Sequence, residues 1–349
     1  MLMDKELPCD FYFGDSRPGN IEELDVSLLS NFKGKFHNVS FGPFYWQCGA
    51  LKLLKSDYTD IITPGDIHCI STWLFLFLAK IFNKRLFFWT HGAYGNEKLL
   101  RRWLIHMRYS YLEGIFLYGN YAKEFLINYG VPENKLHVIY NSLDYDKQTP
   151  MRSIIKPSKI YQSHFGNEYK NIVFIGRLTK VKKLDQIIKA MIMLKGRNVN
   201  LNLTFIGEGT ERTMLTQLAV ENGLNDRIWF YGALYEEKKI AEFLYNADMC
   251  VSPGNVGLTA MHAMSFGTPV ITHNDFAFQM PEFEAIEDGR TGTFFERDDI
   301  SSLANAIERW SNINLNREEV RQNCYSVIDS KYNPHVQIST MSCAIFGQE

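Results

Sequence analysis

Short runs of β-branched and aromatic residues alternate with longer amphipathic stretches along the chain. This alternation is typical of α/β proteins with parallel sheets, in which a helix follows each strand and covers the sheet. In the first half the pattern predicts strands at 10–14, 37–41, 67–70, 85–90, 114–118 and 137–140, and helices at 72–82, 96–111 and 120–129.

A polar stretch with few structural signals, residues 147–171, separates this half from a second series of elements. We therefore place a domain boundary near residue 150. The second series predicts strands at 171–178, 201–206, 227–231 and 248–251, helices at 184–195, 210–222 and 236–245, and closing helices within 301–313 and 317–338.

Composition supports a two-domain globular protein. A chain of 349 residues is too long for one ordinary core, and 46% hydrophobic with 22% charged residues is a globular profile. The formal net charge of −2 gives no reason to expect a nucleic-acid partner.

The cysteines and the apolar runs indicate in which cellular compartment the protein is expected. Six cysteines lie far apart without a C-x-x-C pair, which indicates reduced thiols in a cytoplasmic protein rather than disulfides or a zinc site. The apolar run 73–82 is too short to span a bilayer, and no signal peptide is visible. Because no strand with a Gly-rich loop opens the chain, we expect its first βα unit to be shortened or missing.

Two groups that suit phosphate binding follow predicted strands. In "GRLTKVKK" (176–183), Arg177 and Lys182 combine a planar guanidinium with a flexible ammonium, which suits a diphosphate. In "FIGEGTER" (205–212), Gly207 and Gly209 would let the backbone approach a ligand. Each signal alone is weak, because solvated basic loops and tight G-x-G turns are common.

A third group is "SPGNVGLTAMHAMSFGTPVITH" (252–273), where a turn with Gly254 and Gly257 leads into a helix. The unpaired N–H groups and the dipole at a helix N-terminus favour phosphate oxygens. A side chain at either glycine would crowd the approach of such a ligand. Since parallel strands direct their carboxyl ends to one edge, we expect all three groups in a cleft between two doubly wound domains.

The order GRL-x-x-x-K, G-x-G, G-x-x-G-L-x-x-x-x-A-M, GTPV and E-x-x-x-x-G resembles the donor domain of retaining nucleotide-sugar glycosyltransferases of the GT-B type. These belong to the large family 4 (glycosyl transferases group 1), here of the bacterial surface-polysaccharide type. The resemblance is strong over about residues 171–310 and looser in the first half, through "WTHGAYG" (89–95) and "VIYNSLDYD" (138–146).

The resemblance implies a GT-B α/β fold with two Rossmann-like domains. Residues 1–150 would form the N-terminal, acceptor-side domain, residues 151–330 the nucleotide-sugar donor domain, and residues 331–349 a helix returning to the first domain. His91, which follows a strand, would contact the transferred sugar as the catalytic histidine, although a loop histidine is often only structural.

The resemblance also implies roles in the donor domain. Arg177 and Lys182 would clamp the diphosphate, and the backbone of Val256, Gly257 and Leu258 would hold the distal phosphate. In a separate segment Glu284 matches the glutamate before the family's closing loop, where a plain surface role is equally plausible.

The sequence departs from the family at two positions, because Gly254 and His262 replace a pair of glutamates that reach the donor sugar and the ribose. The imidazole of His262 could still bind a ribose hydroxyl, or it could simply pack in its helix. Gly254 cannot replace a carboxylate, but the amide of Asn255 next to it could contact the sugar.

We expect a UDP- or GDP-linked sugar donor, no other cofactor and no metal. The Asp-x-Asp sequence at 144–146 lies near the predicted domain hinge and is not assigned a metal. The resemblance implies that the leaving phosphate takes the acceptor proton on the same face. The acceptor would be a glycan or a lipid-linked saccharide.

The helix around 96–109 carries Lys98, Arg101, Arg102, His106 and Arg108 among apolar residues. Such a helix suits the inner face of a membrane or a lipid diphosphate, although a solvated amphipathic helix is the more common explanation. Two rival functions stay open: a non-catalytic GT-B partner that only binds sugar nucleotides, and, less strongly, a dinucleotide oxidoreductase, which lacks the third glycine of G-x-G-x-x-G.

Overall fold

The structure, a computed structural model, describes residues 2–15, 25–312 and 316–347 and divides into two compact units. Unit 1 contains the chain up to Tyr140 together with the segment from Pro334 onward, and unit 2 runs from Asn141 to Asn333. The expected boundary at residue 150 falls inside α5 (Tyr145–Ile154), which belongs to unit 2 because it packs against α9 and α10 of that unit.

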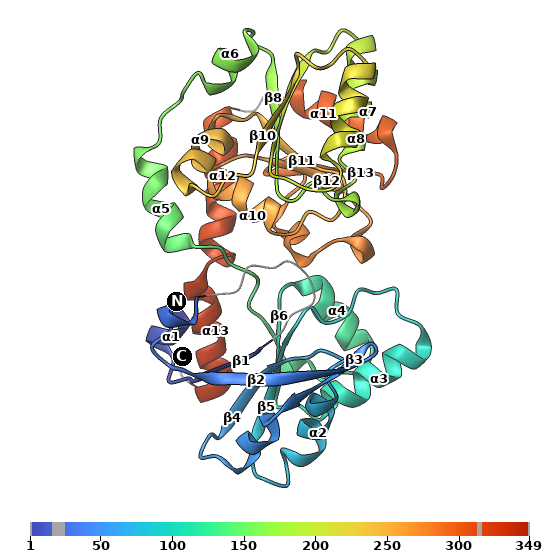
Figure 1. The fold of residues 1–349 in the computed structure, drawn as a ribbon. Helices are drawn as coiled ribbons and strands as arrows, with labels where there is room; N and C mark the ends of the chain where they lie inside the picture. The colour runs from blue at the N-terminus through green and yellow to red at the C-terminus, as the bar shows by residue number, and fades with distance from the viewer. Residues whose placement is uncertain (1, 16–24, 313–315, 348–349) are drawn as a thin grey trace. The chain divides into compact units, whose positions relative to one another are not determined.

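Unit 1 is built on a parallel sheet with the strand order β4-β5-β6-β7. Its strands are β4 (Asp60–Pro64), β5 (Arg85–Thr90), β6 (Gly114–Leu117) and β7 (Leu136–Val138). Its helices are α1 (Leu2–Glu6), α2 (Ile70–Leu78), α3 (Leu99–Ser110), α4 (Asn120–Asn128) and α13 (Pro334–Phe346) (Figure 1).

Both faces of this sheet are covered, as the period-two alternation along β5 shows. Leu86 and Phe88 pack in the core formed with α2, α3 and α4, whereas Phe87 packs with Met341 and Ile345 of α13. The C-terminal helix α13 therefore completes unit 1, and it also contacts α1.

A smaller sheet precedes the main one, with the order β1-β2-β3 for β1 (Phe11–Gly14), β2 (Phe32–Phe41) and β3 (Phe44–Cys48). The predicted strand at 67–70 is wrong: this segment is a turn in which the Asp66 side chain accepts from the N–H of His68, followed by the start of α2. The strand of this region is β4, which the pattern did not predict.

Unit 2 is a parallel six-stranded sheet with the order β10-β9-β8-β11-β12-β13. Its strands are β8 (Lys170–Ile175), β9 (Leu201–Ile206), β10 (Ile228–Gly232), β11 (Met249–Ser252), β12 (Val270–His273) and β13 (Gly292–Phe295). The order reverses between β8 and β11, and ligands of doubly wound sheets bind beyond the strand ends at such a point.

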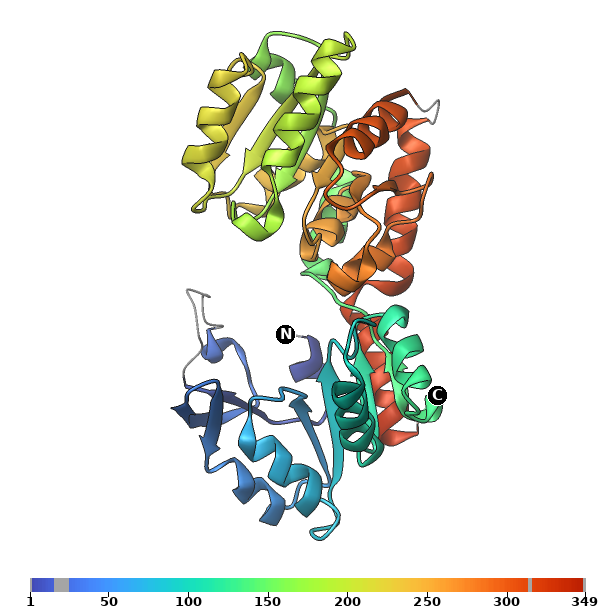
Figure 2. The same ribbon diagram turned by 90° about the vertical axis from the view of Figure 1, so that its right-hand side faces the viewer.

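Helices cover both faces of this sheet (Figures 1 and 2). One layer contains α7 (Asp185–Gly196), α8 (Arg212–Glu221) and α11 (Ile300–Asn312). The other contains α9 (Glu237–Asn246), α10 (Leu258–Ser265) and α12 (Arg317–Lys331), with α5 and α6 (Ile160–Phe165) beside α9. The predicted closing segment 317–338 is two helices, because α12 ends before Pro334 starts α13.

Candidate functional site

The loop after β8 carries two adjacent positive charges. Arg177 is exposed and makes no hydrogen bond or ion pair with any residue that the structure describes. Lys182, in the 3-10 turn η4 (Lys180–Lys182), donates from Nζ to the carbonyl oxygen of Asn255 at 2.6 Å. Burial lowers the pKa of Lys182 to about 8, Glu282 raises it, and the nearby Arg177 lowers it further.

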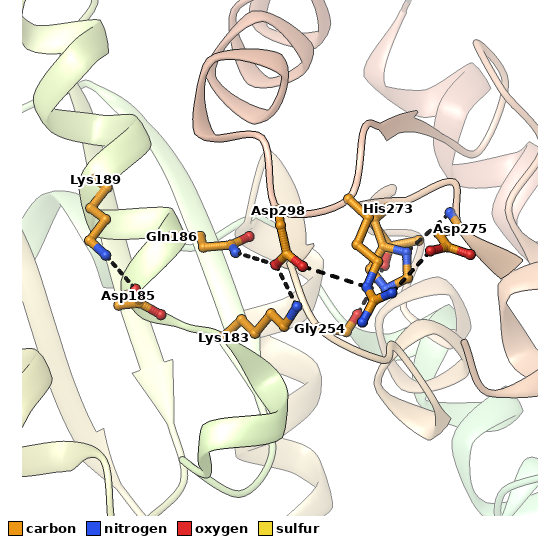
Figure 3. A network of polar contacts seen from close by, with 10 residues as sticks. Lys183, Asp185, Gln186, Lys189, Gly254, His273, Asp275 and Asp298 are labelled. Carbon is orange, nitrogen blue, oxygen red and sulfur yellow. Dashed lines mark hydrogen bonds and ion pairs between the residues drawn. The ribbon is translucent and has the colours of Figure 1, made fainter. Parts of the chain in front are cut away.

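A polar network anchors the end of this loop (Figure 3). The Lys183 ammonium pairs with Asp298, whose Oδ1 also accepts from Gln186 Nε2 at 2.9 Å. In the same network Arg297 pairs with Asp275 at 3.0 Å. The network therefore joins the loop after β8 to the loops after β12 and β13, and it occupies Lys183 rather than Lys182.

Three of the predicted glycines allow close packing of the protein backbone. Cβ atoms added at Gly207, Gly209 and Gly254 would lie 2.0, 2.2 and 2.1 Å from the carbonyl oxygens of Gly176, Leu178 and Val181. These glycines therefore let the loops after β9 and β11 pack directly on the backbone of residues 176–182. The space that a side chain would need at Gly254 is filled by protein, not kept open for a ligand.

Gly257 differs from these three. It is the N-cap of α10 with φ 52° and ψ −149°, a conformation that only glycine adopts readily. An added Cβ would meet only side-chain atoms, Met280 Cγ at 3.7 Å and Lys182 Nζ at 3.9 Å. The Lys182 ammonium thus lies beside the positive end of the α10 dipole.

Two of the three backbone amides predicted to bind phosphate are available in the structure. The N–H of Val256 already donates to Gln279 Oε1 at 2.9 Å. The N–H groups of Gly257 and Leu258 have no acceptor among the described residues, as expected at a helix start. A phosphate group at this helix end would therefore use Gly257 and Leu258 and not Val256.

Gln279 is a residue that the sequence did not reveal. Its buried side chain also donates to Thr272 Oγ1 at 2.8 Å and to the His273 carbonyl at 3.0 Å. Gln279, in the loop after β12, therefore holds the turn before α10 in place. No local sequence motif predicts this long-range contact.

Two oxygen atoms near Lys182 are buried without a hydrogen-bond partner in the described part of the chain. One is Oδ1 of Asn255, the residue expected to replace the missing carboxylate. The other is Oε2 of Glu282, in the turn η6 (Pro281–Ala285), whose Oε1 accepts from Asn141 Nδ2 at 2.8 Å. Glu284, the glutamate predicted from the motif, lies partly exposed in the same turn.

His262 has a protein partner. Its Nε2 lies 2.9 Å from Oε1 of Glu237 on α9, and the same oxygen accepts from Gln148 of α5 at 2.7 Å. Burial alone would raise the pKa of Glu237, but the hydrogen bonds from His262 and Gln148 outweigh it and lower that pKa. This arrangement favours packing between α10 and α9 over a ribose contact.

His91 lies in unit 1, in the loop after β5, whereas the predicted donor residues all lie in unit 2. Its ring packs against Tyr118 with the centroids 4.8 Å apart. Asp144 and Asp146 lie at the start of α5, and no group of three or more potential metal-ligating side chains occurs within the described residues.

The basic helix of unit 1 is less basic on its surface than its sequence suggests. Arg108 is buried and stacks over Trp73, and Arg102 donates to the Glu97 carbonyl, so Lys98 and Arg101 are the most exposed cations at its start. Among residues 2–15, 25–312 and 316–347, no helix has the length and apolarity needed to cross a bilayer.

Comparisons with known families cover nearly the whole chain. The family described as Glycosyl transferases group 1 matches residues 156–327, and Glycosyltransferase Family 4 matches residues 14–147. An uncharacterised 41.2 kDa protein of the Klebsiella pneumoniae cps region is 24% identical over 81% of this chain and 68% of its own length. A Mycobacterium tuberculosis glycogen synthase is 30% identical over a match that covers 39% of this chain and 32% of that enzyme.

Solved structures show the same fold. Anabaena HepE in complex with UDP superimposes with a TM-score of 0.67 at 15% identity, over 91% of this chain and 86% of that one. The lipopolysaccharide outer core galactosyltransferase WaaB gives a TM-score of 0.65 at 16% identity, over 85% and 77% of the two chains. With its two parallel α/β units, the chain has the GT-B fold and belongs to the group 1 glycosyltransferases of family 4.

Proposed function

We propose that this protein transfers a sugar from a UDP- or GDP-linked donor to a glycan or lipid-linked acceptor with retention of configuration. The observation that carries the proposal is the convergence of Arg177, Lys182 and the open amides of Gly257 and Leu258 at the switch point of unit 2. Two cations and a helix N-terminus are a suitable site for a diphosphate.

The donor class agrees with the chemistry of similar proteins. HepE is described in complexes with UDP and with UDP-glucose. Because Arg177, Lys182 and the α10 dipole supply positive charge to the leaving diphosphate, we propose that transfer needs no metal ion and no cofactor besides the donor. His91 would contact the transferred sugar, and the leaving phosphate would accept the proton of the acceptor hydroxyl on the same face.

We place this activity in the biosynthesis of a bacterial surface polysaccharide, at the cytoplasmic face of a membrane. The relative from a cps region and the lipopolysaccharide galactosyltransferase support the polysaccharide part. Exposed apolar side chains on α2 and α3 and in the residues that follow each helix support the membrane part. We call them the α2–α3 surface: Phe77, Ile81, Leu99, Leu100, Trp103 and Tyr111.

Within the α2–α3 surface, the ring of Tyr111 at the end of α3 lies 6.4 Å from that of Phe77 on α2. Lys80, Lys98 and Arg101 are exposed in the same segments of the chain. Apolar side chains next to cations suit an anionic lipid surface or a lipid-linked acceptor.

The alternative is a non-catalytic GT-B subunit that binds a sugar nucleotide without transferring it, which the absence of the glutamates at positions 254 and 262 favours. To distinguish transfer from binding alone, the protein is incubated with a panel of UDP- and GDP-sugars and with lipid-linked glycans in the presence of EDTA. The release of nucleoside diphosphate is then measured. Release with α-configured product from an α-linked donor supports the proposal. Donor binding without release supports the alternative, and release that depends on added Mg²⁺ or Mn²⁺ contradicts metal independence.

A further inference from the structure

Glu282 is a buried carboxylate that none of the roles above uses. Glu282 is only 2% exposed, and its Oε2 has no hydrogen-bond partner within the described residues. An ionised group buried in this way is costly unless a charge or donor compensates it. The feature therefore needs an explanation.

The Lys182 ammonium is the cation available to compensate it. A Cβ atom at Gly257 would lie 3.9 Å from Lys182 Nζ and 3.7 Å from Met280 Cγ, two residues before Glu282. The ammonium and the turn η6 therefore line the same small region at the start of α10. Among the described residues, Lys182 Nζ donates only to a neutral acceptor, the Asn255 carbonyl.

Asn141 fixes the carboxylate in this position. Its Nδ2 donates to Glu282 Oε1 at 2.8 Å, and its Oδ1 accepts from the N–H of Ser142 at 2.9 Å. With Oε1 held in this way, Oε2 is the oxygen that stays buried without a hydrogen-bond partner among the described residues.

We infer that Glu282 is a positioning residue that keeps the buried Lys182 ammonium charged and directed toward the donor diphosphate. The role of Lys182 toward the diphosphate rests on the proposed function, whereas the effect of Glu282 on Lys182 does not depend on it.

The electrostatics of Lys182 agree with this role. Burial lowers the pKa of Lys182 to about 8, Glu282 opposes this, and Arg177 reinforces it. The remaining nearby group, the Cys250 thiol, is neutral, because burial raises its pKa to about 12. Without Glu282 the pKa of Lys182 would fall, and a growing fraction of the side chain would be neutral at physiological pH.

The first experiment needs no ligand. Protein labelled with ¹³C at lysine Cε is titrated by NMR, and the Lys182 signal is assigned with Lys182→Arg. We expect Glu282→Gln to lower the pKa of Lys182 by about one unit or more, and Glu282→Asp to restore most of the shift. Glu221→Gln, an exposed charge loss on α8, is the control and should leave the pKa unchanged. An unchanged Lys182 pKa in folded Glu282→Gln overturns the inference.

The second experiment measures UDP and GDP affinity from pH 7 upward by calorimetry. Because the diphosphate binds the charged lysine, affinity should fall as pH rises through the Lys182 pKa, and in Glu282→Gln this fall should begin at lower pH. Profiles that coincide for the two proteins overturn the inference. If neither nucleotide binds any variant, the proposed donor site fails, whereas the ligand-free titration still decides the role of Glu282.

Discussion

The Lys182 ammonium donates a 2.6 Å hydrogen bond to the carbonyl oxygen of Asn255. This bond ties the basic loop after β8 to the turn that starts α10. The backbone pairing of Gly254 N–H with the Lys182 carbonyl at 3.0 Å reinforces the same junction. The two segments thus form one site, in which the ammonium lies next to the unpaired amides of the helix.

The first prediction concerns Gly254. Gly254→Ala should displace the loop 179–183, because the new Cβ would lie 2.1 Å from the Val181 carbonyl oxygen. We expect a loss of about 1–3 kcal/mol in the free energy of unfolding, together with weaker nucleotide binding. Gly254→Glu should behave similarly or worse and should not act as a restored family carboxylate.

Gly196→Ala is the matched control for this substitution, because a Cβ at the end of α7 meets nothing within 4 Å. Thermal unfolding and calorimetry of the three variants provide the measurements. A Gly254→Glu protein with higher donor affinity and unchanged stability would show that this position is open to the ligand.

A second prediction separates packing from ribose binding at His262. His262→Ala should lose about 0.5–1.5 kcal/mol of stability with little change in nucleotide affinity, since the side chain bonds Glu237. His262→Glu should destabilise the fold more, because it places two carboxylates together, and adding Glu237→Gln should recover much of that loss. Lower UDP affinity in His262→Ala at unchanged melting temperature would instead identify a ribose contact.

The third prediction is the pH dependence of stability contributed by Glu237. Its folded-state pKa is lowered, so its contribution is present above the unfolded pKa and is lost as the pH falls through the folded pKa. In Glu237→Gln, the melting temperature should therefore decrease less on acidification below about pH 4.5 than in the unchanged protein. Parallel melting curves across the acid range would argue against a stabilising His262–Glu237 pair.

The fourth prediction addresses the α2–α3 surface. Trp103→Ser and Leu99→Ser, at side chains 58% and 80% exposed, should each reduce sedimentation with phosphatidylglycerol-containing vesicles by roughly tenfold. Val220→Ser, an apolar side chain 59% exposed on α8, is the control and should bind like the unchanged protein. Equal binding of all proteins, or none to any vesicle, would remove the membrane from the proposed function.

The sequence predicted four of the six strands of unit 2, but not β12 or β13, and it succeeded best where a strand is buried on both faces. The run 201–206 is buried throughout and appears as β9 with the predicted bounds. The polar stretch 147–171 hid α5 and α6, because tertiary contacts rather than apolar periodicity hold them. The hydroxyl of Tyr161, for example, donates to the Phe243 carbonyl from a fully buried position.

The candidate site was predictable only in part, for a similar reason. Arg177, Lys182 and Gly257 follow strand ends, and the carboxyl ends of parallel strands meet at one edge. Glu282 and Gln279 act through partners far away in sequence, Asn141 and Val256, so no local spacing reveals them. The purpose of Gly254 was misjudged because its neighbour, the Val181 carbonyl, comes from another loop.

The most direct test of the donor site is nucleotide binding to Arg177→Ala and Lys182→Ala, measured by calorimetry with UDP and GDP. We predict that the unchanged protein binds at least one of them and that each substitution weakens binding roughly tenfold or more, because a charge-assisted bond contributes about 1.5–3 kcal/mol. Lys180→Ala, which removes an exposed cation from the same loop, should bind normally. Undiminished binding in both Arg177→Ala and Lys182→Ala would contradict the site.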